Sequence, residues 1–364
     1  MRATLPLRST LMLLASLLFA TAHLSLPSEA AALTKEQVEA QSAYDSALAD
    51  FNKVLAERRA QIDGKKKLPT RPGQALYLAR VKVMSTYKDL TDAIPERIGR
   101  PNKFNVPPAY FDAAIEPLIQ EYADLFRVLQ APPANAQDSK TPFKDVVDLG
   151  TVIARAEGLN PTTAQKAGEI SLGLFYAETN GRQNIGNARS KTYMGSLQTG
   201  TSENAKGARK WAAVKAKVRK LDPQLAARDD AEEKRAKGID QRYNHWIAVR
   251  NGLMNAHADL FGQIPEIVKM VPDDIDQMKL FELIQIIPTP TRAALASGDF
   301  ENYRITDPKI MGYLRNNAVF TFGKKDRAKK SATYREILDG MWLFDDKFKR
   351  AQKKYEEVKA GTAG

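Results

Sequence analysis

A single carboxylate, Glu178, stands where an apolar helical segment changes into a loop rich in glycine and asparagine. The segment starts at Asn160-Pro161, a pair typical of a helix N-cap followed by proline in the first turn. Apolar residues spaced three and four apart then place one stripe on the side of Glu178: Ala167, Ile170, Leu174 and Ala177. Burial and the negative end of a helix dipole both raise the pKa of such a carboxyl group. We therefore expect Glu178 to hold a proton near neutral pH and to serve as a general acid.

The residues after Glu178 predict an irregular loop followed by a short return. Helical structure should break at Asn180-Gly181 and again between Asn184 and Asn187. These residues tolerate left-handed backbone and let amide groups approach a polar ligand. Residues Thr192-Tyr193-Met194 are then expected to form a short strand that turns at Gly195. A carboxyl group, a loop and a return segment together are typical of a ligand site.

The segments FYAETN (175–180) and YMGSLQ (193–198) resemble the signature of the lysozyme-like lytic transglycosylases. In that family a helix ends in a Glu-Ser pair, and a Gly-Leu-Met-Gln segment returns under the sugar site. Thr179 replaces the serine and keeps its hydroxyl group, whereas Ser196-Leu197 replaces Leu-Met. The resemblance covers about 30 of the 364 residues.

The resemblance implies cleavage of the peptidoglycan glycan strand at muramyl residues, with neither a metal nor a cofactor. Glu178 would protonate the leaving oxygen, assisted by the N-acetyl group of the sugar. It would then accept the proton of the 6-hydroxyl group, leaving a 1,6-anhydro product. The residues that would bind or line the sugar site are Thr179, Tyr193, Gly195, Ser196 and Gln198. The family also supplies a tyrosine from a later helix, for which Tyr243 and Tyr313 are the candidates.

Amphipathic patterns on both sides of this segment predict a mainly α-helical protein. Residues 33–130 carry three apolar stripes, which suit an N-terminal helical hairpin or bundle. The proline-rich residues 131–142 are expected to be a linker. Residues 143–352 should form a lysozyme-like helical domain with a small β part, and residues 353–364 a charged tail.

Residues 1–32 predict a secretory signal peptide. Arg2 and Arg8 precede a short apolar run over 11–22, and Ala30-Ala31-Ala32 fits a cleavage site. We expect an exported protein, periplasmic or secreted, that is soluble after cleavage, because no second long apolar run follows. The sequence contains no cysteine, which excludes disulfides and thiolate chemistry.

The net charge of +12 favours polyanionic partners. Nucleic acid is not expected for an exported chain, which leaves the peptidoglycan strand as the main expected partner. Seven Lys or Arg residues between Lys206 and Lys220 predict a basic helix. That helix is either a solvated face or a surface for an anionic envelope polymer or lipid.

Other chemistries find less support in the sequence. After the predicted signal peptide only His245 and His257 remain, and a zinc site needs three or four ligands, so no metal is expected. The pairs Asp229-Asp230 and Asp273-Asp274 are interpreted as helix caps or solvated turns. The alternative to an enzyme is a non-enzymatic wall-binding or envelope scaffold protein that keeps a lysozyme-like groove without turnover.

Overall fold

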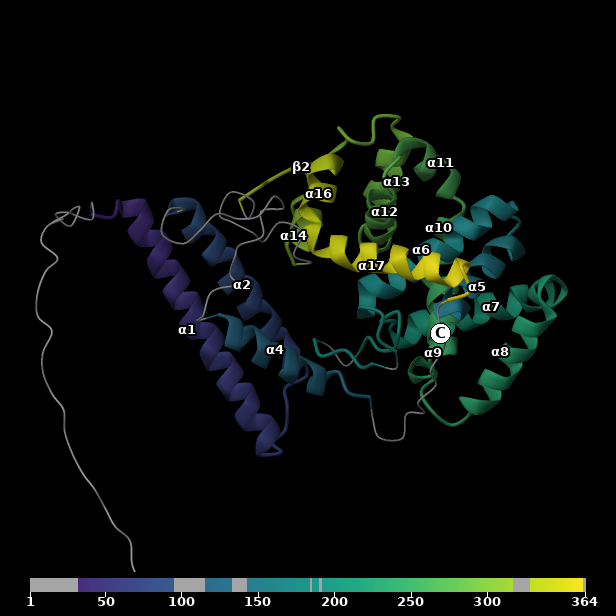
Figure 1. The fold of residues 1–364 in the computed structure, drawn as a ribbon, viewed down its shortest axis with the longest axis horizontal. Helices are drawn as coiled ribbons and strands as arrows, with labels where there is room; N and C mark the ends of the chain where they lie inside the picture. Colours follow the sequence, from purple (N-terminus) through teal and green to yellow (C-terminus); the bar gives the residue numbers. More distant parts are fainter. Residues whose placement is uncertain are drawn as a thin grey trace, which may run out of the picture.

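A computed structural model describes residues 32–94, 115–132, 143–183, 185–189, 192–316 and 328–362. The predicted signal peptide, up to residue 31, lies outside the described residues, as do positions 133–142 of the expected linker. The described chain is mainly helical, which confirms the predicted class at that level (Figure 1).

The first three described helices surround an apolar core of their own. They are α1 (Lys35–Asp63), α2 (Pro72–Ala93) and α4 (Glu116–Leu129). Their facing side chains form a buried cluster that includes Phe51, Leu55, Leu76, Val83, Leu90 and Leu125. Pro117 lies in the first turn of α4, where its missing amide hydrogen leaves no helical hydrogen bond unmade. These helices lie together on the left of Figure 1.

The remaining elements form a second, larger helical body. In chain order they are α5 (Phe143–Ala156), α6 (Pro161–Thr179), α7 (Thr201–Leu221), α8 (Pro223–Arg235), η2 (Gln241–Tyr243), α9 (His245–Gly252), η3 (Leu253–His257), α10 (Ala258–Phe261), α11 (Ile264–Met270), α12 (Asp274–Ile286), α13 (Pro288–Ala296), β1 (Arg304–Ile305), α14 (Pro308–Asn316), β2 (Ala332–Thr333), α16 (Tyr334–Gly340) and α17 (Trp342–Lys359). Strands β1 and β2 pair antiparallel, with Arg304 opposite Thr333.

Helix α6 is the centre of this body. Gly150 of α5 and Gly168 of α6 lie so close to the partner helix that a Cβ atom on either would come within 2.2 to 2.4 Å of a side-chain oxygen. Residues 167–177 are therefore buried on every side of α6. The expected one-sided stripe is wrong, because α5, α12 and α17 all pack against this helix.

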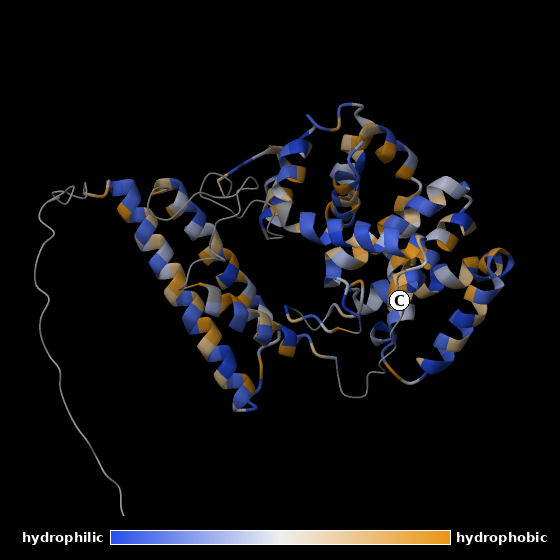
Figure 2. Cartoon of the chain, viewed as in Figure 1, coloured by the Kyte–Doolittle hydropathy of each residue, from blue (hydrophilic) through white to orange (hydrophobic). Residues whose placement is uncertain are grey.

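Hydrophilic and hydrophobic residues alternate around the helices in Figure 2. Most of these helices therefore bury one part of their surface and expose another, whereas α9 is buried along its whole length. Among the described helices, none is both long enough and apolar enough to cross a membrane.

The last helix corrects one prediction from the sequence. Residues from Lys353 were expected to form a charged tail, but α17 continues to Lys359. Its apolar positions recur at spacings of four, three and four, and the last of them, Tyr355, is only 5% exposed: Phe344, Phe348, Ala351 and Tyr355. This face packs against α6, so residues 353–359 belong to the folded body.

Candidate functional site

Helix α6 delivers Glu178 as the sequence predicts. The Asn160 side chain accepts a hydrogen bond from the Thr163 amide, and Pro161 occupies the first turn. The helix ends at Asn180, whose backbone is left-handed at φ +58° and whose amide donates to the Tyr176 carbonyl at 2.8 Å. Helix α6 is therefore capped at both its first and its last turn.

The Glu178 carboxyl group is half-buried where α6 meets two other helices, α12 and α17. Gln285 of α12 donates a hydrogen bond from Nε2 to Glu178 Oε1 at 2.9 Å. Lys347 of α17 donates to the neighbouring carbonyl of Ala177. A small buried apolar cluster also joins α6, α12 and α17: Ala177, Met278 and Phe348. The carboxyl group is thus removed from water on most sides while one hydrogen bond holds its orientation.

Burial raises the pKa of Glu178 to about 7, which confirms the predicted direction. The Lys347 charge and the Gln285 hydrogen bond oppose this rise in pKa, as does Arg189, whereas the Glu203 charge adds to it. Near neutral pH a large share of Glu178 therefore carries a proton.

Glu282 is a second buried carboxyl group, one helical turn before Gln285 on α12 and only 5% exposed. Burial raises its pKa well above the ordinary value, and the negative charge of Glu178 adds to the effect. Burial also lowers the pKa of Lys347. Burial therefore favours the neutral form of Glu282 over the ionised form.

Thr179 connects α6 to the return segment. Its hydroxyl group lies 3.0 Å from the Phe175 carbonyl oxygen and 3.3 Å from that of Ser196, so its single hydrogen can be donated to either. The side chain is only 2% exposed. Thr179 is consequently placed to position the end of α6 rather than to touch a ligand.

The return segment is a tight turn closed by an antiparallel bridge between Met194 and Thr199. Gly195 has φ +79°, and a Cβ atom there would lie 2.1 Å from the carbonyl oxygen of Arg242, so only glycine fits. Gln198 folds back and donates its side-chain amide to the Gly195 carbonyl at 2.8 Å. The polar groups of the turn are largely used within the turn itself.

Ser196 faces inwards, away from any ligand. Its hydroxyl group is hydrogen-bonded to His245 Nδ1, and both side chains are fully buried. Burial, reinforced by the charge of Arg228, lowers the pKa of His245 to about 3. His245 is therefore a neutral packing residue, and the expected binding role of the Ser196 side chain does not fit its position.

Tyr193 and Glu203 form the outward edge of the turn. Tyr193 is 42% exposed, and its ring lies beside Gly200 together with the Glu203 carboxyl group. Glu203 accepts a hydrogen bond from the Gly200 amide at 2.7 Å, which caps α7. Of the tyrosine candidates, Tyr243 donates its hydroxyl group to the Met194 sulfur at 2.9 Å, whereas Tyr313 is exposed on α14. Tyr243 is thus the candidate that lies against the turn.

An acidic cluster on α8 has spacing suited to a metal ion: Asp229, Asp230 and Glu233. The Lys215 ammonium group occupies its centre, 2.7 to 3.1 Å from a carboxylate oxygen of each residue. Because the Lys215 side chain pairs with all three carboxylates, it occupies the place that a metal ion would take. The prediction of a solvated turn is nevertheless wrong for Asp229, which is fully buried within α8.

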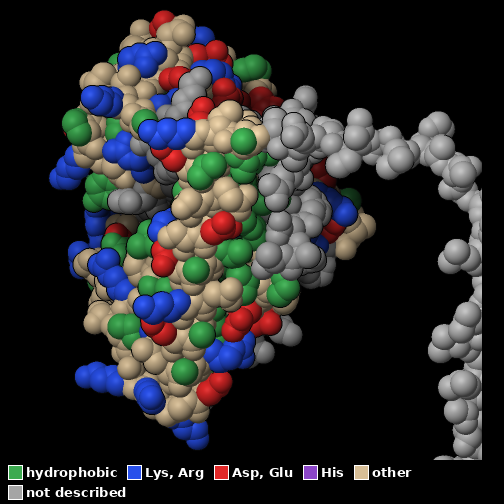
Figure 3. Space-filling view, turned by 90° about the vertical axis from the view of Figure 1, so that its left-hand side faces the viewer, with side chains coloured by type: hydrophobic (Ala, Val, Ile, Leu, Met, Phe, Trp, Pro, Cys, Tyr) green, Lys and Arg blue, Asp and Glu red, His purple; other side chains and the backbone are tan. Residues whose placement is uncertain are grey.

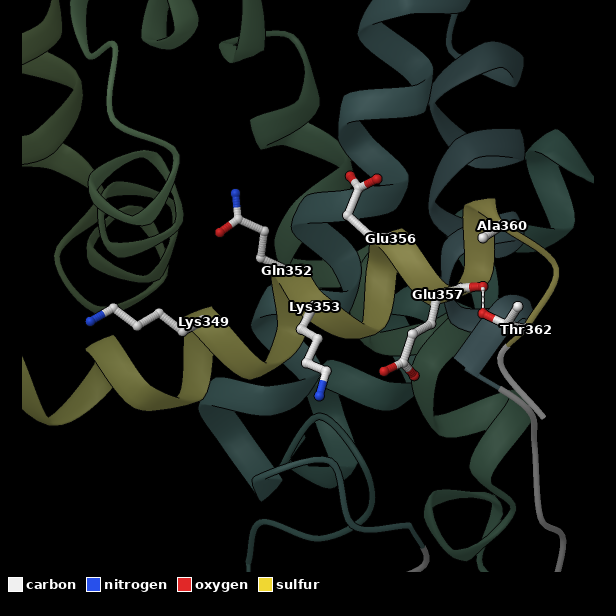
Figure 4. Close-up of a pocket in the computed structure, with 7 residues that line it drawn as sticks. All are labelled: Lys349, Gln352, Lys353, Glu356, Glu357, Ala360 and Thr362. Atoms are coloured by element: carbon white, nitrogen blue, oxygen red, sulfur yellow. Dashed lines mark hydrogen bonds between the residues drawn. The ribbon is translucent and has the colours of Figure 1, made fainter.

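A hollow lies along α17, and Glu178 is not among the residues that line it (Figure 4). Its lining residues are Lys349, Gln352, Lys353, Glu356, Glu357, Ala360 and Thr362. The Thr362 hydroxyl group donates to the Glu357 carbonyl at 3.1 Å and closes one end. None of these residues contributes to the surroundings of Glu178, so the hollow is a separate surface feature.

Comparison of the chain with family models, with curated proteins and with solved structures finds no match. The function is therefore inferred from the residues around Glu178. Sequence reasoning identified Glu178, Thr179 and the turn, but it missed Gln285, Glu282 and Lys347. Two polar residues three apart inside the apolar run LFELIQII (280–287) are the one signal that marks the α12 pair.

Proposed function

We propose that this protein cleaves the glycan strand of peptidoglycan at muramyl residues, with Glu178 as the single general acid and base. The observation that carries the proposal is the half-buried Glu178 carboxyl group, whose pKa is raised to about 7. A proton donor works best when its pKa lies near the working pH. Thr179 ties the helix that bears it to the turn at 194–199.

Single-acid chemistry suits the charges of the site. Cleavage by two carboxylates needs one protonated and one ionised group flanking the scissile bond. Burial disfavours the ionised form of Glu282, which makes this residue a poor anionic nucleophile. A substrate that brings its own nucleophile, the N-acetyl group, removes the need for a second ionised carboxylate.

In the proposed reaction the Glu178 carboxyl group transfers a proton twice, first as an acid and then as a base. Glu178 gives its proton to the glycosidic oxygen as the bond from C1 to that oxygen breaks, and the N-acetyl oxygen bonds to C1. The Glu178 carboxylate then takes the proton of the 6-hydroxyl group, whose oxygen displaces the N-acetyl oxygen from C1. The products are a 1,6-anhydro end and a free 4-hydroxyl end, and Glu178 regains its proton.

The proposal includes a lysozyme-like arrangement of the second helical body and action in the cell envelope after export. Its support is the resemblance of residues 175–180 and 193–198 to the lytic transglycosylase signature. The order of helix, loop and turn around Glu178, with Tyr243 against Met194, is consistent with it. The positive n-region and apolar run of residues 1–32 support export.

The test is Glu178→Gln on purified peptidoglycan sacculi, with muropeptides analysed by mass spectrometry. Loss of general acid catalysis should slow cleavage by about 100-fold or more. Glu169→Gln is the matched control, because Glu169 is also a buried glutamate of α6 but pairs with Lys166 at 2.9 Å. Anhydro ends that persist at the normal rate in the Glu178 variant would overturn the mechanism.

A non-enzymatic wall-binding or scaffold protein is the second candidate. Three side chains that were expected to bind the sugar form hydrogen bonds within the protein instead, which favours this candidate: Thr179, Ser196 and Gln198. This reading predicts that the wild-type protein sediments with sacculi while the muropeptides remain unchanged.

A further inference from the structure

The loop that follows Glu178 is fastened to the N-terminal helices. The Gly73 amide of α2 donates to the Ala188 carbonyl at 2.6 Å, and the Gly186 amide donates to the Gln130 carbonyl after α4 at 2.7 Å. Arg182 donates to Gln130 Oε1 at 2.9 Å. In Figure 1 this teal loop lies towards the N-terminal helices.

These contacts satisfy backbone groups that helix ends leave unpaired. Gly73 lies in the first turn of α2, where amide groups have no partner within the helix. Gln130 is the C-cap of α4, where carbonyl groups lack one in the same way. The loop therefore caps the start of α2 and the end of α4. If the loop moved, the Gly73 amide and the Gln130 carbonyl would lose these hydrogen bonds.

Close contacts of backbone and side chains hold the loop against α2. A Cβ atom at Gly73 would come within 2.5 Å of the Ala188 carbonyl oxygen, so the backbones touch directly. Ala188 itself is fully buried. The Arg189 guanidinium group lies over the Tyr77 ring at 4.2 Å, a cation–π contact that anchors its charge.

The other side of the same loop belongs to the Glu178 site. The Gly195 amide donates to the Ile185 carbonyl at 2.7 Å, and Arg182 Nε donates to the Thr179 carbonyl at 3.2 Å. Arg189 acts on the Glu178 carboxyl group through its charge. One loop thus joins the N-terminal helices to the helix end, the turn and the acid of the site.

We propose that the bundle of α1, α2 and α4 is a positioning element of the Glu178 site, acting through loop residues 182–183 and 185–189. Gly73, Tyr77 and Gln130 are its positioning residues, and Arg189 is the charge they hold beside Glu178. The consequence for catalysis rests on the proposed function, whereas the fastening of the loop does not.

The first test introduces a steric clash between α2 and the loop with Gly73→Ala in the full-length protein. The added methyl group favours helix formation in α2 but collides with Ala188, so it should move the loop without unfolding the bundle. Hydrogen exchange at the Gly186 and Gly195 amides should become about tenfold faster or more, while exchange in α2 stays unchanged. Gly312→Ala is the control, since a Cβ atom there meets nothing within 4 Å. Unchanged exchange at Gly186 and Gly195 would overturn the fastening.

The second test releases the charge with Tyr77→Leu and measures cleavage of sacculi against pH. The groups that face Glu178 are Glu282, Lys347, Glu203 and Arg189. Because Arg189 favours the ionised form of Glu178, its release should move the loss of activity at high pH to higher pH and lower kcat. Gln130→Ala removes the side-chain partner of Arg182 and should also loosen the loop. Gln120→Ala is its control, since the Gln120 side chain donates to Asp124 within α4. Faster loop exchange with unchanged kcat and pH profile would overturn the positioning role, whereas an inactive wild type would overturn the proposed function alone.

Discussion

At the scale of single residues, the protonation of Glu178 depends on groups that lie far apart in the sequence. Its hydrogen-bond partner comes from α12, and the positive charge with the largest effect on its pKa comes from α17. The sequence predicts that Glu178 ends a buried helix, and hence the direction of its pKa shift. It does not predict that Glu282 and Lys347 share the same interior, because neither residue is close to Glu178 in sequence and Lys347 is one of many charged residues on α17.

The raised pKa of Glu178 predicts how stability changes with pH. The folded protein binds this proton up to about pH 7 and the unfolded chain only up to about pH 4.5, so ionisation destabilises the fold as the pH rises between these values. Glu178→Gln removes the ionisation, and the variant should gain about 2 to 3 kcal/mol over the wild type between pH 5 and pH 8. Urea unfolding at both pH values measures the difference.

The control for this prediction is Glu57→Gln, because Glu57 is an exposed residue of α1 with a side chain 57% accessible. Its effect on the free energy of unfolding should be the same at both pH values. A Glu178→Gln effect that is equally independent of pH would mean that Glu178 ionises as freely as a surface group.

At the scale of helices, Asp229 is the hub that joins α7, α8 and α9. It accepts hydrogen bonds from the indole groups of Trp211 and Trp246, both at 2.9 Å, and pairs with Arg250 at 2.6 Å. Asp229 is fully buried and Arg250 is 2% exposed. These helices carry Glu203 and His245, so the hub also supports the elements beside the candidate site.

Asp229→Asn should destabilise the protein by about 2 to 4 kcal/mol, because it leaves the buried Arg250 charge poorly compensated. Glu233, which also pairs with Arg250, limits the loss. Tryptophan fluorescence during urea unfolding measures the change, since Trp211 and Trp246 both report on the hub. Asp230→Asn, at a side chain 40% exposed, should cost about 1 kcal/mol or less. Equal costs for the two variants would contradict the hub.

Local chemistry decides how much of the fold could be predicted. The start of α6 at Asn160-Pro161 is confirmed because capping and proline act on adjacent residues. The burial of Asp229 was missed because it depends on two tryptophans 18 residues before and 17 residues after it. The continuation of α17 beyond Lys353 was missed because frequent charges hide its apolar spacing. Signals on adjacent residues are thus predictable, whereas contacts between helices, and the apolar spacing of a highly charged helix, are not.

At the scale of the whole molecule, some Lys and Arg side chains are paired with acidic residues, whereas others are exposed to solvent. On the face shown in Figure 3, Lys and Arg side chains are interspersed with Asp and Glu. On α7, Lys215 and Arg219 turn towards α8 and pair with its acids. The exposed cations that remain on α7 lie within about 80° of one another at 100° per residue: Lys206, Arg209, Lys217 and Lys220. They form a stripe about 20 Å long.

We expect this stripe to bind anionic polymers or lipid surfaces in a salt-dependent way. Reversing its four charges to glutamate should abolish binding to vesicles rich in anionic lipid at low ionic strength, because screening and charge removal act on the same interaction. Reversal of Lys65, Lys66, Lys67 and Arg71 is the matched control, since all four are exposed and the change in net charge is equal. A stripe that docks the polymer predicts loss of binding only in the α7 variant. Equal loss in both variants would show that attraction follows net charge alone, and the α7 helix would then be a solvated face.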